Sequence, residues 1–96
     1  MKETFLTRNP DTKKKGVRVD KIKYDIIRDA IIAILRERGP LSFANLLAAM
    51  KERVDSAKFD GGSSVNWHTT TVRLDMEAKG ELVYDRKAKK PLFVLP

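Results

Sequence analysis

The stretch "VRLDMEAKGELVYDRKAKKPLFVLP", residues 72–96, links the end of a helix to a basic β-hairpin. The helix is expected to end at Gly80, because glycine is common just past a helix C-terminus. Leu82 and Tyr84 alternate with Val83, which indicates a short strand. Residues 87–90 then form a basic turn, and residues 91–96 provide a second strand. The end of the chain is therefore predicted to be a helix followed by a hairpin.

Two further helices are predicted upstream of this stretch. The first covers residues 21–38, with Asp20 as its N-cap and Gly39 at its end, followed directly by a proline. The second covers residues 43–54, where Ser42 provides the cap and apolar residues recur at helical spacing.

Between the second and third helices, residues 55–64 contain adjacent glycines and are predicted to form a loop. Ser63 or Ser64 is then expected to cap the third helix, which continues to residue 79. Leu41, between the first two helices, is predicted to form a short strand.

The first 19 residues show no helical or alternating period and contain a run of three lysines. We predict an extended or mobile basic arm over residues 1–19 and one folded domain over residues 20–96. The expected fold class is mainly α with a small β-hairpin.

This order of elements resembles a winged helix-turn-helix domain, with three helices and a C-terminal wing. The segment "VRLDMEAKGEL" running into a hairpin carries most of the resemblance. With "KGVRVDKIKYDIIRDAI" included, the chain is also similar to a family of small winged-helix-like proteins with no assigned function. The resemblance implies that the third helix, about residues 64–79, enters the major groove of DNA while the wing tip at residues 86–90 contacts the backbone.

The charge distribution favours an anionic partner. The net charge is +7, and the whole excess lies at the two ends of the chain. Residues 1–23 carry +5 and residues 81–96 carry +2, whereas residues 24–80 are neutral. Nucleic acid or an acidic surface would therefore be attracted to the ends.

The absence of cysteine excludes disulfides, thiolate metal sites and thiol catalysis, and is compatible with a reducing cytosol. No apolar run is long enough for a signal peptide or a membrane span. We therefore expect a cytoplasmic protein that does not enter a membrane.

Helical geometry predicts which residues of the third helix face outward. If Val72 points inward, then Val65, His68, Thr69 and Met76 share the core side, and Thr71 lies on a flank. Short polar and basic side chains on the opposite side suit DNA, since Asn can read adenine and Arg can read guanine or bind phosphate. The predicted DNA-binding residues are Asn66, Thr70 and Arg73 on the helix and Arg86, Lys87, Lys89 and Lys90 on the wing. The cluster of Lys13, Lys14 and Lys15 is a candidate basic arm for the minor groove or a lysine-rich tail.

Trp67 and Leu74 are seven residues apart and share one stripe of the third helix. An exposed apolar stripe is uncommon on a monomer, so we expect it to be covered by the arm, by residues 57–62 or by another subunit. This supports an alternative function, a winged-helix protein-interaction module that uses this stripe or helix 21–38 and does not bind DNA. The wide apolar face of helix 21–38 also leaves three explanations open: a central position in the core, cover by the arm, or a homodimer through this helix or the arm.

An enzyme is not expected. His68 is the only histidine and lies on the core side, which indicates a hydrogen-bonded structural residue rather than a metal ligand or a base. Asp75 and Glu77 point to different faces and form no acid–base pair. We therefore predict no catalytic residue, metal or cofactor.

Overall fold

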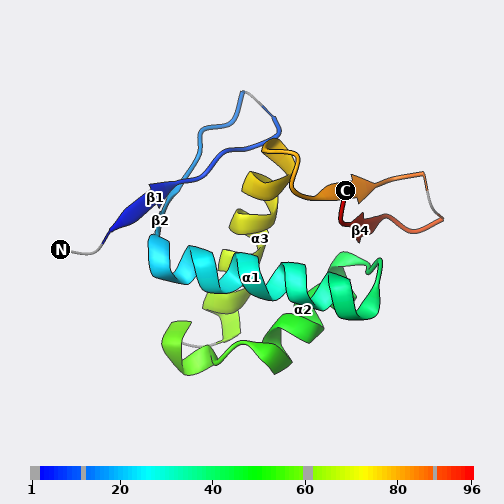
Figure 1. Ribbon diagram of the computed structural model, residues 1–96. Helices are drawn as coiled ribbons and strands as arrows, with labels where there is room; N and C mark the ends of the chain where they lie inside the picture. The colour runs from blue at the N-terminus through cyan, green and yellow to red at the C-terminus, as the bar shows by residue number, and fades with distance from the viewer. Residues whose placement is uncertain (1–2, 12, 60–61, 88) are drawn as a thin grey trace.

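The computed structural model describes residues 3–11, 13–59, 62–87 and 89–96. The described chain is mainly helical, with two small antiparallel hairpins (Figure 1). In chain order the elements are β1 (Thr4–Leu6), β2 (Arg18–Asp20), α1 (Lys21–Arg38), α2 (Phe43–Arg53), the 3₁₀ helix η1 (Ser56–Phe59), α3 (Gly62–Ala78), β3 (Val83–Asp85) and β4 (Leu92–Val94).

The first two helices confirm the predicted boundaries closely. The Asp20 carboxylate accepts a hydrogen bond from the backbone N–H of Ile22 at 2.9 Å, as an N-cap should. At the other end of α1, Gly39 has a φ of 77°, and its N–H donates to the carbonyl of Leu35. Ser42 caps α2 by accepting from the N–H of Asn45.

The predicted start of α3 is wrong by about one half-turn of helix. The helix already includes Gly62, so Ser63 and Ser64 lie inside it and are not its caps. The preceding segment, predicted as a loop, contains η1 and the fully buried Phe59. A glycine in the first turn costs less than one in a helix interior, because the first N–H groups have no intrahelical partner anyway. The segment predicted as a loop is therefore partly helical and partly buried.

The core lies where the three helices meet the C-terminal hairpin. The predicted inward set on α3 is confirmed, since Val65, Thr69, Val72 and Met76 are fully buried and His68 nearly so. His68 is also a hydrogen-bonded residue as predicted, with its Nδ1 2.7 Å from the carbonyl oxygen of Ser64. From the other elements, the fully buried side chains include Ile27, Ile31, Leu46, Met50 and Phe93.

The predicted C-terminal hairpin is confirmed. Strands β3 and β4 pair antiparallel, with Tyr84 opposite Phe93. Leu41 forms an isolated antiparallel bridge to Phe93, with hydrogen bonds in both directions. The short strand predicted at Leu41 is therefore a single bridging residue that attaches β4 to the connection between α1 and α2.

The N-terminal hairpin was not predicted. Strands β1 and β2 pair antiparallel, with Phe5 opposite Val19. Val19 is buried in the main core, and Phe5 packs against that core. Residues assigned to an arm thus belong to the folded unit, and their strands are too short to produce an alternating pattern in the sequence.

Candidate nucleic-acid interface

The C-terminal hairpin is attached to α3 through Arg73. The guanidinium carbon of Arg73 lies 5.0 Å from the ring centre of Phe43, 5.4 Å from that of Phe93 and 5.7 Å from that of Tyr84. Its Nη1 also donates to Glu77 Oε2 at 2.9 Å. A guanidinium stacked on aromatic rings gains both dispersion and cation–π attraction. Arg73 therefore connects α3 to the start of α2 and to both strands of the hairpin.

The predicted outward face of α3 is only partly open. The Arg73 side chain is 20% exposed, and Asn66 is half-buried. Asn66 Oδ1 and Arg73 Nε are buried, and neither has a hydrogen-bond partner among the described residues. Thr70 is half-buried, and its hydroxyl donates to the carbonyl of Asn66 at 2.9 Å. The three predicted reading residues thus share one side of α3, but their polar groups are largely engaged or packed.

The Trp67 and Leu74 stripe is only partly covered by its own chain. Trp67 is 46% exposed, and Leu74 is half-buried. The indole contacts the His68 ring edge-on, with 4.9 Å between the ring centres. Thr71, predicted on a flank, is buried instead. The solvent-facing arc of α3 therefore centres on Trp67, Thr70 and Leu74.

The predicted wing tip is exposed. Arg86, Lys87, Lys89 and Lys90 all lie on the surface, beyond the paired strands, while residue 88 is outside the described part of the chain. The Asp85 carboxylate accepts from the backbone N–H of Lys87 at 2.9 Å, which begins the turn. Four cations are thus concentrated on a hairpin that extends away from the helices (Figure 1).

The candidate arm lysines lie on a turn with defined geometry. Lys13, Lys14 and Lys15 are exposed, and residue 12 is outside the described part of the chain. The backbone N–H of Asp11 donates to Asn9 Oδ1 at 2.9 Å, and the Asp11 carboxylate accepts from the N–H of Lys13 at 3.0 Å. These bonds are typical of turns built by Asn and Asp. The second basic cluster is therefore presented at the end of the N-terminal hairpin.

A buried carboxylate, Asp75, attaches this hairpin to the helices. Asp75 is fully buried and accepts hydrogen bonds from the Tyr24 hydroxyl and, at 2.7 Å, from the backbone N–H of Arg8. Lys79 Nζ lies 2.9 Å from its Oδ2. The same ammonium lies 4.2 Å from the ring centre of Phe5, which packs on Tyr24. Asp75 thus joins α1, α3 and the N-terminal hairpin at one point.

Burial of the Tyr24 side chain, together with its hydrogen bond to Asp75, raises the pKa of its phenol well above the usual range. The neutral phenol is therefore the form that the fold stabilises. The sequence contained a signal for this cluster, because Asp75 falls within about 60° of the inward-pointing Val72 on a helix. A carboxylate on a core face requires partners. Asp75 and Glu77 do lie on different faces, as predicted.

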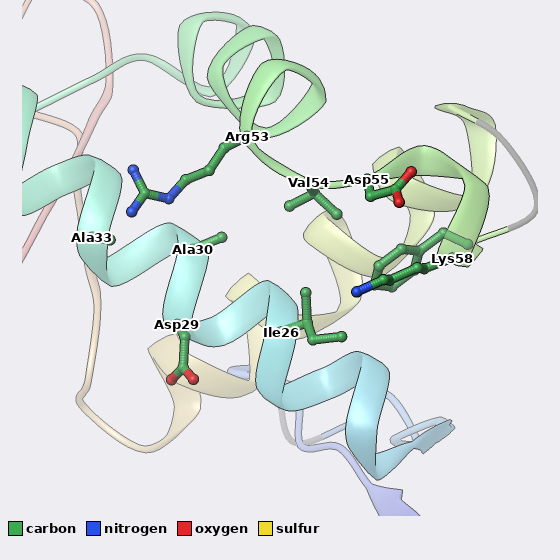
Figure 2. A pocket seen from close by; sticks show the side chains of 9 residues that line it. Ile26, Asp29, Ala30, Ala33, Arg53, Val54, Asp55 and Lys58 are labelled. Atoms are coloured by element: carbon green, nitrogen blue, oxygen red, sulfur yellow. The ribbon is translucent and has the colours of Figure 1, made fainter.

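A separate open pocket of about 490 Å³ lies between α1, the end of α2 and η1 (Figure 2). Its floor is apolar, whereas charged side chains from all three elements surround it (Figure 2). Nearby on α1, Ile22 is 72% exposed, so the wide apolar face of this helix is only partly covered by the core. The apolar lining comes from Ile26, Ala30, Ala33, Val54 and Phe59, and the charged residues are Asp29, Arg53, Asp55 and Lys58.

Within the described ranges, no three His, Cys, Asp or Glu side chains come together as a metal site would require. The helices of the described chain are also too short or too polar to cross a bilayer.

One family model matches residues 4–92, and its description is a family of unknown function, DUF6958. The match covers nearly the whole chain, from β1 to the start of β4, and the protein belongs to this family. No curated protein and no solved structure matches the chain.

Proposed function

We propose that this member of a family of unknown function is a winged-helix DNA-binding protein. It acts as a small cytoplasmic transcriptional regulator. Helix α3 lies against the major groove, and the tip of the β3–β4 hairpin contacts the neighbouring phosphates. The observation that carries the proposal is the placement of four exposed cations, at residues 86–90, on a hairpin that Arg73 fixes to α3.

The order of the elements supports this assignment. Three helices are followed by a hairpin, and Leu41 adds a bridge to β4 from the connection between α1 and α2. This is the arrangement that the resemblance to winged helix-turn-helix domains implies. The hairpin corresponds to the wing, and α3 to the recognition helix.

Some residues of α3 and the wing position the wing, and others contact DNA. Arg73 is engaged with three rings and Glu77, so its main role in the proposal is to hold the wing in place. Thr70 and the first turns of α3 provide close approach to the groove, and Asn66 contributes at its edge. Lys87, Lys89 and Lys90 supply most of the affinity, because phosphate neutralisation dominates protein–DNA binding.

A duplex titration at two salt concentrations tests the proposal. We expect the wild-type protein to bind at low salt, and the variant Lys87→Gln/Lys89→Gln/Lys90→Gln to bind more weakly, with a shallower salt dependence. The matched control, Arg36→Gln/Lys51→Gln/Lys58→Gln, removes three exposed charges from other elements and should retain most of the affinity. Absence of wild-type binding at low salt would refute the proposal.

A second function is favoured by one observation, the 46% exposure of Trp67. A protein partner could bury Trp67 together with Leu74, since tryptophan is a frequent anchor of protein interfaces. This alternative predicts that Trp67→Ala abolishes capture of a protein partner while duplex binding is absent in both proteins.

The open face of α1 is the proposed contact of a homodimer. Ile22 and the apolar pocket floor would be buried together, and the pocket carries equal numbers of acidic and basic residues, so two copies would not repel each other there. Sedimentation equilibrium tests this contact. A dimer that Ile22→Lys converts to a monomer supports it, and a wild-type monomer at high concentration excludes it.

A further inference from the structure

We infer that the N-terminal hairpin is a second DNA-binding element, which contacts the phosphate backbone on the opposite side of α3 from the wing. This inference rests on the proposed function and extends it. Two hairpins would then hold a duplex against the open arc of α3, and Lys13, Lys14 and Lys15 would supply the second set of phosphate contacts.

The placement of the two attachment points on α3 is the first argument. Arg73 holds the C-terminal hairpin, and Asp75 holds the N-terminal hairpin. Two residues along an α-helix correspond to a rotation of about 200°, so the attachments are on nearly opposite sides of the helix. The arc left between them contains Trp67, Thr70 and Leu74. Figure 1 shows the two hairpins on either side of α3, with their loops directed away from the helical core.

The rigidity of the attachment is the second argument. Asp75 accepts a charge-assisted hydrogen bond from the Arg8 N–H, at the residue where the N-terminal loop leaves its strand. The Tyr24 hydroxyl, on α1, and the Lys79 ammonium, directly after α3, bind the same carboxylate. A hydrogen bond to a buried charge is stronger than one between neutral groups. The base of the loop is therefore fixed to the recognition helix. A positioned binding element requires such an attachment, whereas a mobile tail would lack it.

The loop is narrow at its neck, where Thr7 faces Gly16 and Val17. Thr7 is buried and bonds Val17 three times, with its N–H and hydroxyl donating to the Val17 carbonyl and its Oγ1 accepting from the Val17 N–H. Next to it, a Cβ atom added to Gly16 would lie 1.7 Å from the Thr7 carbonyl oxygen. Only glycine allows the two sides of the loop to approach this closely. The neck and the turn at Asn9–Asp11 together set the direction in which the lysines are presented.

The charge of the loop identifies the ligand. Lys13, Lys14 and Lys15 are exposed, whereas the one acidic side chain of the loop, Asp11, accepts a hydrogen bond from the N–H of Lys13. Lysine is a point charge that suits phosphate without base specificity. Double-stranded DNA offers phosphates on both sides of the groove that α3 would occupy, which matches two basic tips separated by one helix.

Fluorescence anisotropy with a short mixed-sequence duplex tests the inference. Relative to wild type, Lys13→Gln/Lys14→Gln/Lys15→Gln should bind more weakly at low salt, with a log–log salt slope smaller in magnitude by about 2–3. The ratio of the variant's dissociation constant to that of wild type should then fall by about 40-fold between about 50 and 200 mM salt, since each phosphate contact contributes about 0.9 to the slope. The Arg36→Gln/Lys51→Gln/Lys58→Gln protein controls for net charge and should keep the wild-type slope.

Each outcome has a separate meaning. If wild type binds the duplex and the Lys13–Lys15 variant binds with the same affinity and slope, the second element is refuted and the proposed function stands. If wild type does not bind DNA, the proposed function fails, and this inference fails with it. Binding to vesicles of anionic lipid without duplex binding would also overturn it, in favour of a membrane surface.

The variant Gly16→Ala separates a fixed loop from a basic tail. It changes no charge, but its Cβ would overlap the Thr7 carbonyl oxygen and contact the Arg8 backbone nitrogen, so it forces the neck apart. We expect duplex affinity to fall by roughly the same factor as for the lysine variant, while the helical circular dichroism signal is retained. Unchanged affinity in Gly16→Ala would show that the lysines attract DNA without being positioned, which contradicts the inference.

Discussion

The two hairpins have the same size and opposite means of attachment. Each pairs two strands of three residues, and each is fixed to α3. The C-terminal hairpin is held by a cation stacked among aromatic rings, and the N-terminal hairpin by a buried carboxylate that accepts hydrogen bonds. Since an isolated two-stranded hairpin is marginally stable in water, both depend on the helix for their stability. The two attachments show that one helix can position two surface elements through unrelated interactions.

The largest expected effect is on stability, and it differs between the two hairpins because they bury different amounts of apolar surface. Phe93→Ala should destabilise the protein by about 3–5 kcal/mol, because this ring is fully buried and its strand residue pairs with both Tyr84 and Leu41. Phe5→Ala, the matched change in the other hairpin, should cost less because Phe5 is only partly buried. Urea unfolding of both variants measures the difference. Equal losses would show that the two hairpins contribute equally to the core.

The next effect concerns the buried carboxylate. Asp75→Asn removes the charge that pairs with Lys79 and weakens the bonds from Tyr24 and Arg8, so we expect a loss of about 2–4 kcal/mol. Hydrogen exchange should show the Arg8 amide becoming unprotected while the amides of β3 and β4 keep their relative protection. The control is Glu77→Gln, which breaks the partly exposed pair with Arg73 and should cost less. A stable Asp75→Asn protein with a protected Arg8 amide would contradict the assigned role.

A pH titration distinguishes the tyrosines of the two hairpin attachments. The folded state raises the pKa of Tyr24, so its contribution to stability is complete below about pH 10, the usual value for tyrosine, and is lost as pH rises further. Above that pH, wild type should lose up to about 1.4 kcal/mol per pH unit more than Tyr24→Phe. Tyr84→Phe serves as the control for the other hairpin. If the Tyr24→Phe protein loses stability as steeply as wild type, the phenol is not held neutral by the fold.

The smallest expected effect tests the stacked guanidinium. Arg73→Lys retains the positive charge but loses the planar group that lies over Phe43, Tyr84 and Phe93. We expect a loss of about 1 kcal/mol, together with increased proteolysis between residues 86 and 90. The N-terminal loop should remain equally resistant. Cleavage of both loops at the same increased rate would show that the hairpins are not independently attached.

Prediction from sequence succeeded where the signal was local. Asp20, Ser42 and Gly39 mark helix ends through their own chemistry, so α1 and α2 were placed closely. The C-terminal hairpin was predicted because its strands are joined by a short basic turn. The start of α3 was misplaced because the adjacent glycines and serines were interpreted as a loop and a cap, whereas the helix already includes Gly62.

The candidate interface was predictable only in part. The exposure of the lysines at both hairpin tips was predictable from the sequence, because clustered cations are rarely buried. The packing of Arg73 was not predictable, because it depends on rings from α2, β3 and β4 that are distant in the sequence. For the same reason the outward face of α3, with Asn66, Thr70 and Arg73, was expected to be more exposed than it is.

The sequence alone determined three amphipathic helices, the N-caps of the first two, the basic ends and the C-terminal hairpin, because periodicity and capping act over a few residues. Only the tertiary structure decided that residues 4–20 fold back as a second hairpin on the core. Pairing Thr4 with Asp20 closes a long loop. The contacts that offset this closure are distant in the sequence, since Val19 and Phe5 pack on the core and Arg8 bonds Asp75, more than fifty residues further along the chain. A contact of that kind leaves no period in the sequence, so it becomes visible only when α1 and α3 have brought its members together.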